Sequence, residues 1–358
     1  MGSWGRRAIR TTIAETPRTT AAAAVAFVAL ALVLAFVPVP YVAWSPGRTE
    51  DVLGPAADGS GQAIRVSGLT DYPTTGQLRL TTVSVTRVDS PLTLPAALAA
   101  HWLPWRYVLP RAAVYPPGTT AEENTEANTR MMDSAQQSAV VSALRAAEVT
   151  VTPVAMVVGV TDGSPADGTL EPGDTIVSVD GRAVDTPAEA VSAIRDRRVG
   201  DPVRLVIRRA DARREVEITT GPSDDDSTRP MIGAVVDTGY DHPGTVDFGI
   251  DPSIGGPSAG LVFALAVYDR LTPGDLTAGR VIAGTGTIDV EGDVGSIGGI
   301  GSKIRGAEND GARLFLLPED NCTEVADLSA DIPLVPVSTL DEAIAALTTP
   351  VDDLPHCP

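Results

Sequence analysis

A chain of 358 residues is longer than one compact core usually requires, and this length predicts two or three domains. The hydrophobic content of 43% and the ordinary numbers of glycine and proline, 34 and 29, are typical of a globular protein. The formal net charge of −19 excludes nucleic acid as a partner, because binding to phosphates requires a basic face.

The first feature along the chain is an apolar run over residues 21–37, which four arginines precede. Continued to residue 43, the run is long enough to cross a hydrocarbon core of roughly 30 Å. Arginines before such a run predict that the N-terminus is cytoplasmic, and Tyr41 and Trp44 suit the far interface. We therefore predict a cytoplasmic N-terminus over residues 1–20 and a transmembrane anchor over residues 21–43.

This anchor predicts a single-pass cell-membrane protein that contacts the lipid bilayer and carries its other domains outside the cytoplasm. A cleaved signal peptide is the alternative, because the small-x-small triplet Ala43-Trp44-Ser45 follows the run. The run is, however, longer than the about 7–15 apolar residues that are usual in a signal peptide.

The predicted extracytoplasmic N-terminal region, residues 44–150, contains two clear elements. Gln77–Val85 alternates apolar and polar residues, which predicts a half-buried strand. Residues 120–148 have the pattern of a helix, with Thr120 placed before Glu122 as helix starts prefer. The residues do not indicate what this region does.

Residues 154–221 have a different pattern, with a strand, a glycine-rich turn, a helix and two further strands. The order resembles a bacterial PDZ domain. The residues that carry the resemblance are Gly163-Ser164-Pro165-Ala166, Leu170 with Gly173-Asp174 and Ile176, and Val179-Asp180-Gly181 with Val184. Such a domain binds an extended peptide as an added strand, which would lie beside Val158, Gly159 and Val160. A packing module without a peptide ligand is the alternative.

A polar, acidic linker is predicted over residues 222–230, and a last domain over residues 231–348 with a tail over residues 349–358. Inside this domain, a strand over 246–251 leads through a glycine-rich turn into an apolar helix. Ser258 lies at the turn, where helix N-terminal amides can bind an oxyanion. An ordinary helix cap is the alternative explanation of this serine.

The basic residues are 26 arginines and a single lysine, Lys303, which lies 45 residues after Ser258. Arginine stays protonated at any working pH, whereas a buried lysine can lose its proton and act as a base. Gly298 and Gly299 precede Lys303 in a stretch that superficially suggests a phosphate loop. Ile304 follows the lysine where such a loop needs serine or threonine, so we predict no nucleotide binding.

The serine and lysine segments, in their order and separation, resemble the proteolytic domain of Lon proteases. The matching residues are Gly256-Pro257-Ser258-Ala259-Gly260, Gly284-Thr285-Gly286 and Gly298-Gly299-Ile300-Gly301-Ser302-Lys303. The resemblance implies a Lon-type α/β fold, Ser258 as nucleophile, Lys303 as base and Thr285 in support, with Gly256, Pro257 and Ala259 shaping the turn. It also implies a homo-oligomer.

Two departures from the Lon pattern stand out. Gly255 lies where many family members carry aspartate, and no ATPase motif is present in the chain. The arrangement resembles membrane-anchored, PDZ-containing Lon-like proteins of bacteria. It predicts an ATP-independent serine endopeptidase that acts on unfolded or flexible extracytoplasmic segments, with the PDZ-like domain positioning the peptide. A catalytically inactive peptide-binding scaffold or a membrane adaptor is the alternative.

A Ser-His-Asp triad is a competing mechanism, for which His242 is the best of the three histidines. No spacing suggests a metal or cofactor site, and Cys322 and Cys357 are either one disulfide or two separate thiols. The predicted fold class is an α+β multidomain protein with an N-terminal transmembrane helix, a PDZ-like β-rich domain and a Lon-type α/β proteolytic domain.

Overall fold

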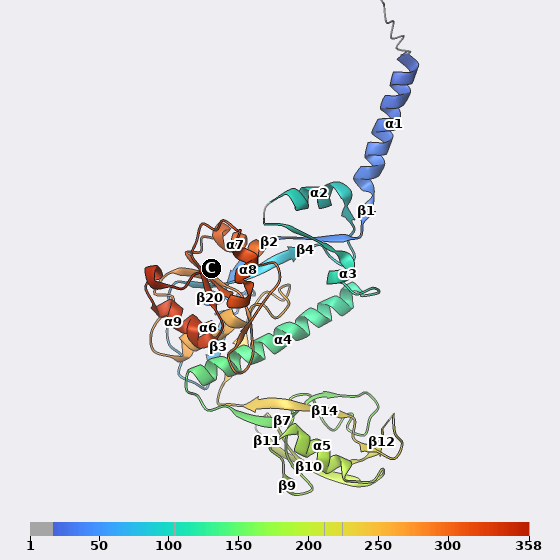
Figure 1. Cartoon of the computed structure of the whole chain (residues 1–358). Helices are drawn as coiled ribbons and strands as arrows, with labels where there is room; N and C mark the ends of the chain where they lie inside the picture. Colours follow the sequence, from blue (N-terminus) through green and yellow to red (C-terminus); the bar gives the residue numbers. More distant parts are fainter. Residues whose placement is uncertain (1–16, 104, 211, 224, 358) are drawn as a thin grey trace, which may run out of the picture.

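The structure, a computed structural model, describes residues 17–103, 105–210, 212–223 and 225–357 (Figure 1). A larger body contains elements from both ends of the chain, and a smaller body lies between them in sequence. Figure 1 shows the long helix α4 (Ala121–Ala146) between the two bodies. α4 begins with a capping box, in which Thr120 and Glu123 satisfy each other's backbone N–H groups, so the predicted helix start is confirmed.

The larger body is built on a sheet with the strand order β20-β19-β16-β4-β2-β6. Its strands are β2 (Tyr41–Asp51), β4 (Gln77–Val85), β6 (Tyr107–Pro110), β16 (Val281–Gly284), β19 (Leu314–Pro318) and β20 (Leu334–Val337). β4, β16, β19 and β20 are parallel, whereas β2 runs antiparallel to both β4 and β6. The predicted strand over Gln77–Val85 is confirmed as β4. It pairs with β16, which lies about 200 residues later in the chain.

Helices cover both faces of this sheet. Because successive side chains of a strand point to opposite faces, one strand contributes to the apolar cores on both sides. Leu314 and Leu316 pack with the apolar helix α6, whereas Phe315 and Leu317 pack with α7. The helices of this body, besides α4, are α6 (Gly260–Leu271), α7 (Ile300–Asn309), α8 (Cys322–Val325) and α9 (Leu340–Thr348). Its short elements are β3 (Ile64–Ser67), β15 (Thr245–Phe248), β17 (Thr287–Ile288), β18 (Val294–Gly295), η1 (Glu319–Asn321) and η2 (Val351–Asp353).

The smaller body has its own sheet, with the strand order β11-β10-β8-β7-β14, and its own apolar core. Its elements are β7 (Thr152–Val160), β8 (Thr175–Val179), β9 (Arg182–Ala183), α5 (Pro187–Arg195), β10 (Pro202–Arg209), β11 (Ala212–Thr219), β12 (Gly221–Pro222), β13 (Pro230–Met231) and β14 (Ala234–Asp241). β14 follows the predicted linker, yet it pairs along its whole length with β7. The smaller body is therefore an insertion between α4 and β15, and β15 pairs with β3 in the larger body.

The predicted membrane anchor is wrong. Within the described ranges, no helix is both long enough and apolar enough to cross a membrane. Helix α1 (Pro17–Phe36) ends before Pro38, and the residues that the anchor needed at its far end lie in β1 (Pro38–Val39) and β2. The transmembrane part of the predicted fold class and the single-pass membrane localisation are corrected accordingly. Most of the predicted cytoplasmic segment, residues 1–16, lies outside the described residues.

The rest of the N-terminal region packs onto the larger body around β2. Its elements are β5 (Leu92–Thr93), which pairs with β1, and the helices α2 (Leu94–Trp102) and α3 (Arg111–Val114). β6 then completes the edge of the large sheet by pairing with β2. The residues to which the sequence assigned no role therefore form part of the same sheet as β16 and β19.

Cys322 and Cys357 form a disulfide that joins α8 to the C-terminal tail, which decides between the two predicted alternatives. Replacing both cysteines by serine is expected to lower the free energy of unfolding by about 2–4 kcal/mol, because the bond closes a loop of 35 residues. Urea denaturation of both proteins measures the difference. A reducing agent should destabilise the unmodified protein and leave the stability of the double variant unchanged. Equal stability of the two proteins in the absence of reducing agent would contradict the prediction.

Candidate active site

Ser258 lies at the turn between β15 and α6, one residue after Pro257 and partly exposed to solvent. Gly256 has a φ of +91°, which only glycine adopts without strain, and its N–H donates to the carbonyl of Asn128 in α4. A side chain at Gly255 would place its Cβ 2.8 Å from the Cβ of Asn128. The close approach of this loop to α4 therefore leaves no room for a side chain at position 255.

Lys303 lies in the first turn of α7, and its residue is only 2% exposed. Gly299 precedes the helix in the left-handed region, with a φ of 73°. Any Cβ at Gly298 or Gly299 would meet the ring of Trp44 at about 3 Å. The two glycines thus let α7 approach β2 closely, and this approach aims the lysine side chain into the interior.

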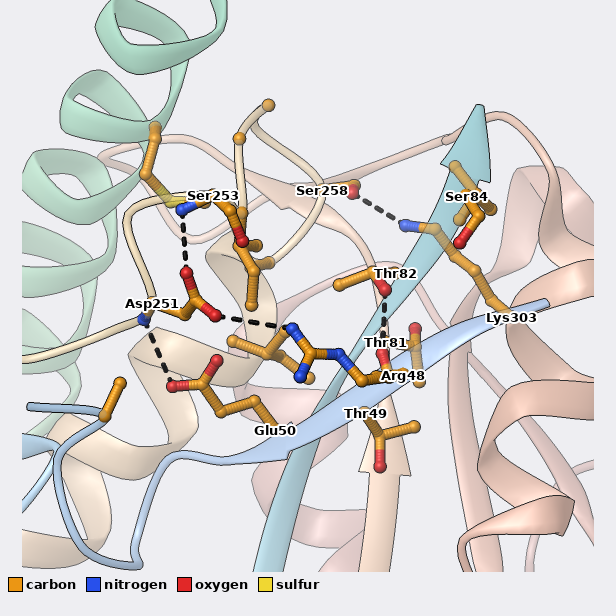
Figure 2. Close-up of a pocket in the computed structure, with 18 of the residues that line it drawn as sticks. Arg48, Thr49, Glu50, Thr81, Thr82, Ser84, Asp251, Ser253, Ser258 and Lys303 are labelled. Carbon is orange, nitrogen blue, oxygen red and sulfur yellow. Dashed lines mark hydrogen bonds and ion pairs between the residues drawn. The ribbon is translucent and has the colours of Figure 1, made fainter. Parts of the chain in front are cut away.

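The side chains of Ser258, Thr285 and Lys303 meet at one point. The Nζ of Lys303 lies 2.6 Å from the Oγ of Ser258 and 2.8 Å from the Oγ1 of Thr285. Figure 2 shows the contact between Ser258 and Lys303. Thr285, which directly follows β16, is fully buried. The structure therefore brings together the three side chains that the sequence singled out.

The hydrogen bonds define where the protons lie. Thr285 has one hydroxyl proton, which it donates to the backbone carbonyl of Ser258 at 3.0 Å. Its Oγ1 must therefore accept an N–H from Lys303. When the amine is neutral, its lone pair is left to accept the hydroxyl proton of Ser258; when the amine is charged, it donates to Ser258 instead.

Burial lowers the pKa of Lys303 from its ordinary value of 10.5 to about 7. The cause is desolvation, because a buried ammonium loses its hydration shell and the neutral amine does not. A comparable fraction of neutral and charged amine is thus present near pH 7. This is the range in which a lysine serves as a general base.

Ser258 and Lys303 open onto a cleft of about 650 Å³. Leu80, Met132 and Ala259 form a buried apolar part of its lining. Arg48 and Asp251 lie toward the other side of the cleft and form an ion pair of 3.4 Å (Figure 2). No histidine in the described part of the chain lines this cleft, so the triad through His242 gains no support.

Sequence reasoning missed the wall of this cleft that the N-terminal region supplies. Residues 48–51 of β2 and 81–84 of β4 lie along the cleft, and Glu50 there accepts the N–H of Asp251. Burial raises the pKa of the Glu50 carboxyl. The alternation over Gln77–Val85 identified a strand but carried no information on its neighbours, because pairing with β16 is not local.

The structure also changes the expected position of the peptide-binding edge. The sequence predicts that Val158, Gly159 and Val160 are open to a peptide strand. In the structure, Val160 pairs with Ala234 and Gly159 pairs with Val235, so β14 occupies this edge. A peptide could pair there only by displacing β14. The prediction placed β14 beyond the linker, in the other domain, and this part of it is corrected.

Two segments of the chain match models of known families. Residues 249–349 match the Lon protease (S16) C-terminal proteolytic domain, and residues 128–220 match the PDZ domain. The predicted resemblances to these two kinds of domain are confirmed. The first match contains Ser258, Thr285 and Lys303, and neither match includes β14.

Curated relatives of the chain are Lon proteases. The chain is 40% identical over 103 residues to a Lon protease of Chloroflexus aurantiacus, covering 26% of this chain and 12% of the relative. It is 35% identical over 91 residues to an archaeal Lon protease of Methanocaldococcus jannaschii, covering 25% and 14%. The chain thus spans about an eighth of the length of these relatives.

Solved structures similar to the chain include the PDZ domain of an SdrC-like protein from Listeria monocytogenes. It is 27% identical, with a TM-score of 0.22, and covers 23% of this chain and 86% of that chain. Another is a protein from Geobacillus thermodenitrificans, 30% identical with a TM-score of 0.21, covering 23% and 94%.

Proposed function

We propose that the chain is a serine endopeptidase of the Lon type, in which Ser258 is the nucleophile and Lys303 its base. The observation that carries the proposal is the contact of 2.6 Å between the Ser258 hydroxyl and the buried amine of the only lysine in the chain. All other basic residues of the Lys/Arg type are arginines, which stay protonated. The one lysine, which can lose its proton, is buried beside a serine in a cleft.

In the proposed mechanism, neutral Lys303 takes the proton of Ser258 as the serine oxygen attacks a peptide carbonyl. Thr285 holds the amine in place and, through its bond to the Ser258 carbonyl, also holds the serine backbone. In the described chain, the N–H groups of Ser258 and Ala259 donate to no backbone carbonyl, so both are available to the oxyanion. The lysine then protonates the leaving amine, and water releases the acyl group from the serine.

The proposed substrates are unfolded or flexible protein segments, and cleavage needs no ATP. The support for this substrate class is that the proposed nucleophile lies in an open cleft. Positioning of the peptide by the PDZ domain is part of the same proposal, because such domains bind extended peptides.

The test is incubation of the purified full chain with casein in the absence of nucleotide, together with a fluorophosphonate probe that labels reactive serines. We expect cleavage of casein, no acceleration by ATP, and mass-spectrometric labelling of Ser258 alone. Binding of casein without cleavage, combined with an unlabelled Ser258, would favour the inactive scaffold instead.

The activity should depend on pH through Lys303. Because the base must be neutral, kcat/KM is expected to rise about tenfold per pH unit below pH 7 and to level off above it, with a midpoint near the pKa of about 7. Initial rates with a labelled casein in constant-ionic-strength buffers measure this profile. A rate that does not change between about pH 5.5 and 8.5 would rule out a lysine base with this pKa.

A further inference from the structure

Helix α7, which carries Lys303, begins without a side-chain cap. The first N–H groups of a helix have no partner within the helix, and Gly299 at the N-cap has no side chain that could accept from them. Lys303 is the fourth residue of α7, so its amine moves with this first turn. The position of the amine therefore depends on groups from other parts of the chain that hold the turn.

Residues 105–107, in the N-terminal region, supply two of these groups. The hydroxyl of Tyr107, in β6, accepts the N–H of Gly301, and any Cβ at Gly301 would overlap this hydroxyl. The hydroxyl of Ser302 donates to the carbonyl of Trp105 at 2.6 Å. Trp105 itself has a φ of 66°, in the left-handed region that residues other than glycine rarely adopt. A side chain and a carbonyl that are remote in sequence thus hold the first turn of α7.

The ring of Trp44, in β2, supports the backbone that leads into α7, and Figure 1 shows α7 beside β2. A Cβ at Gly298 or Gly299 would lie 2.8 to 3.1 Å from carbon atoms of this ring. The indole N–H is buried and, among the described residues, has no hydrogen-bond partner. Because a buried donor without a partner is unfavourable, hydrogen bonding does not account for a tryptophan here. The contact that the ring makes with the two glycines is apolar packing.

We propose that Tyr107 and Trp44 are positioning residues, which hold the first turn of α7 so that the amine of Lys303 meets the serine hydroxyl. This inference rests on the proposed peptidase function, and it gives the N-terminal region a part in the reaction. The Nζ of Lys303 lies 2.6 Å from the Oγ of Ser258, and a displacement of about 1 Å can reduce a rate about 10²-fold. A looser turn also admits water to the amine, which removes part of the desolvation that lowers the pKa of Lys303.

The first test is kinetic and uses the full chain with Tyr107→Phe, which keeps the ring and removes the hydroxyl that accepts from Gly301. We expect kcat on labelled casein to fall about tenfold and KM to stay within about twofold, because the residues that line the cleft are unchanged. Tyr115→Phe is the matched control. It removes a hydroxyl of the same region that donates to the carbonyl of Thr86, and it should leave kcat within about twofold.

The second test observes Lys303 directly, because it is the only lysine in the chain. Protein labelled with ¹³C at the lysine Cε gives one NMR signal that follows the protonation of the amine. The signal of the unmodified protein should titrate with a pKa of about 7, and that of Trp44→Ala at least roughly one pH unit higher. Tyr107→Phe should move it in the same direction. Trp102→Ala, which removes a ring that is 77% exposed, should titrate as the unmodified protein does.

The unmodified protein and Tyr107→Phe together separate this inference from the peptidase function. If the unmodified protein cleaves casein and a folded Tyr107→Phe shows the same kcat and the same lysine titration, the inference fails alone, even if Trp44→Ala does not fold. A fall in kcat that only matches a loss of folded protein by circular dichroism, with an unchanged lysine titration, also overturns it. Intact casein with the unmodified protein defeats the function and the inference that rests on it.

Discussion

Replacing Ser258 by alanine, or Lys303 by methionine, is expected to reduce casein hydrolysis by roughly 10⁴-fold or more. The serine variant has no oxygen to form the acyl-enzyme, and the lysine variant has no group within 2.6 Å that can take the hydroxyl proton. Because the two side chains act as a unit, the double variant should be no less active than either single one. Initial rates on labelled casein measure all three.

The matched controls remove the same chemical groups elsewhere. Ser134→Ala removes an exposed hydroxyl on α4, and Arg305→Met removes a cation from α7 whose side chain is 40% exposed. Both should stay within about twofold of the unmodified rate. If Lys303→Met retained most of the activity in a folded protein, the base would have to be another group, and the proposed dyad would be abandoned.

Lys303→Met is also expected to increase the free energy of unfolding, by about 2–4 kcal/mol at pH 6. The lysine pKa is about 7 in the folded protein against 10.5 when unperturbed. Between these values the unfolded chain binds the extra proton, so the stability of the unmodified protein rises with pH through this window. The burial of the charged amine therefore destabilises most at and below pH 7, and an unbranched apolar side chain removes that penalty.

Urea denaturation at about pH 6 and pH 9 measures this effect, and the gain should be smaller at the higher pH. Lys303→Arg provides the contrast. Because arginine keeps its charge at both pH values, it should lower the stability at each of them. If Lys303→Met were less stable than the unmodified protein at pH 6, burial of the charged lysine would not destabilise the fold. A lowered pKa of Lys303 would then have no physical cause.

The candidate site was predictable where its chemistry is local in sequence. Ser258 follows a strand and precedes an apolar helix, and Lys303 is the sole lysine, so these two could be identified from the sequence around them. Thr285, which follows β16, was identified only through the Lon resemblance. Their meeting point could be inferred only from the Lon resemblance. The wall formed by residues 48–51 could not be predicted, because it depends on β2 pairing with β4 across a bulge.

The fold was least predictable where a strand pairs far from its sequence neighbours. β14 follows an acidic segment whose sequence is typical of a domain boundary. In the structure, however, β14 hydrogen-bonds to β7 and is part of the PDZ sheet. The apolar run from residue 21 was interpreted by composition alone. Its continuation beyond Phe36 is extended, since β2 gains a partner on each side from β4 and β6.

The insertion of the PDZ domain between the strands of the larger sheet has a consequence for how the protein is made. The hydroxyl of Thr81 in β4 donates to the carbonyl of Gly284, one residue before Thr285, across 203 positions of chain. On the ribosome, β4 emerges long before its partner β16, and the PDZ domain can fold during the interval because its contacts lie within one segment. The proposed nucleophile and its base are brought together only when synthesis has passed α7, so a nascent or truncated chain carries a folded PDZ domain without the proposed catalytic site.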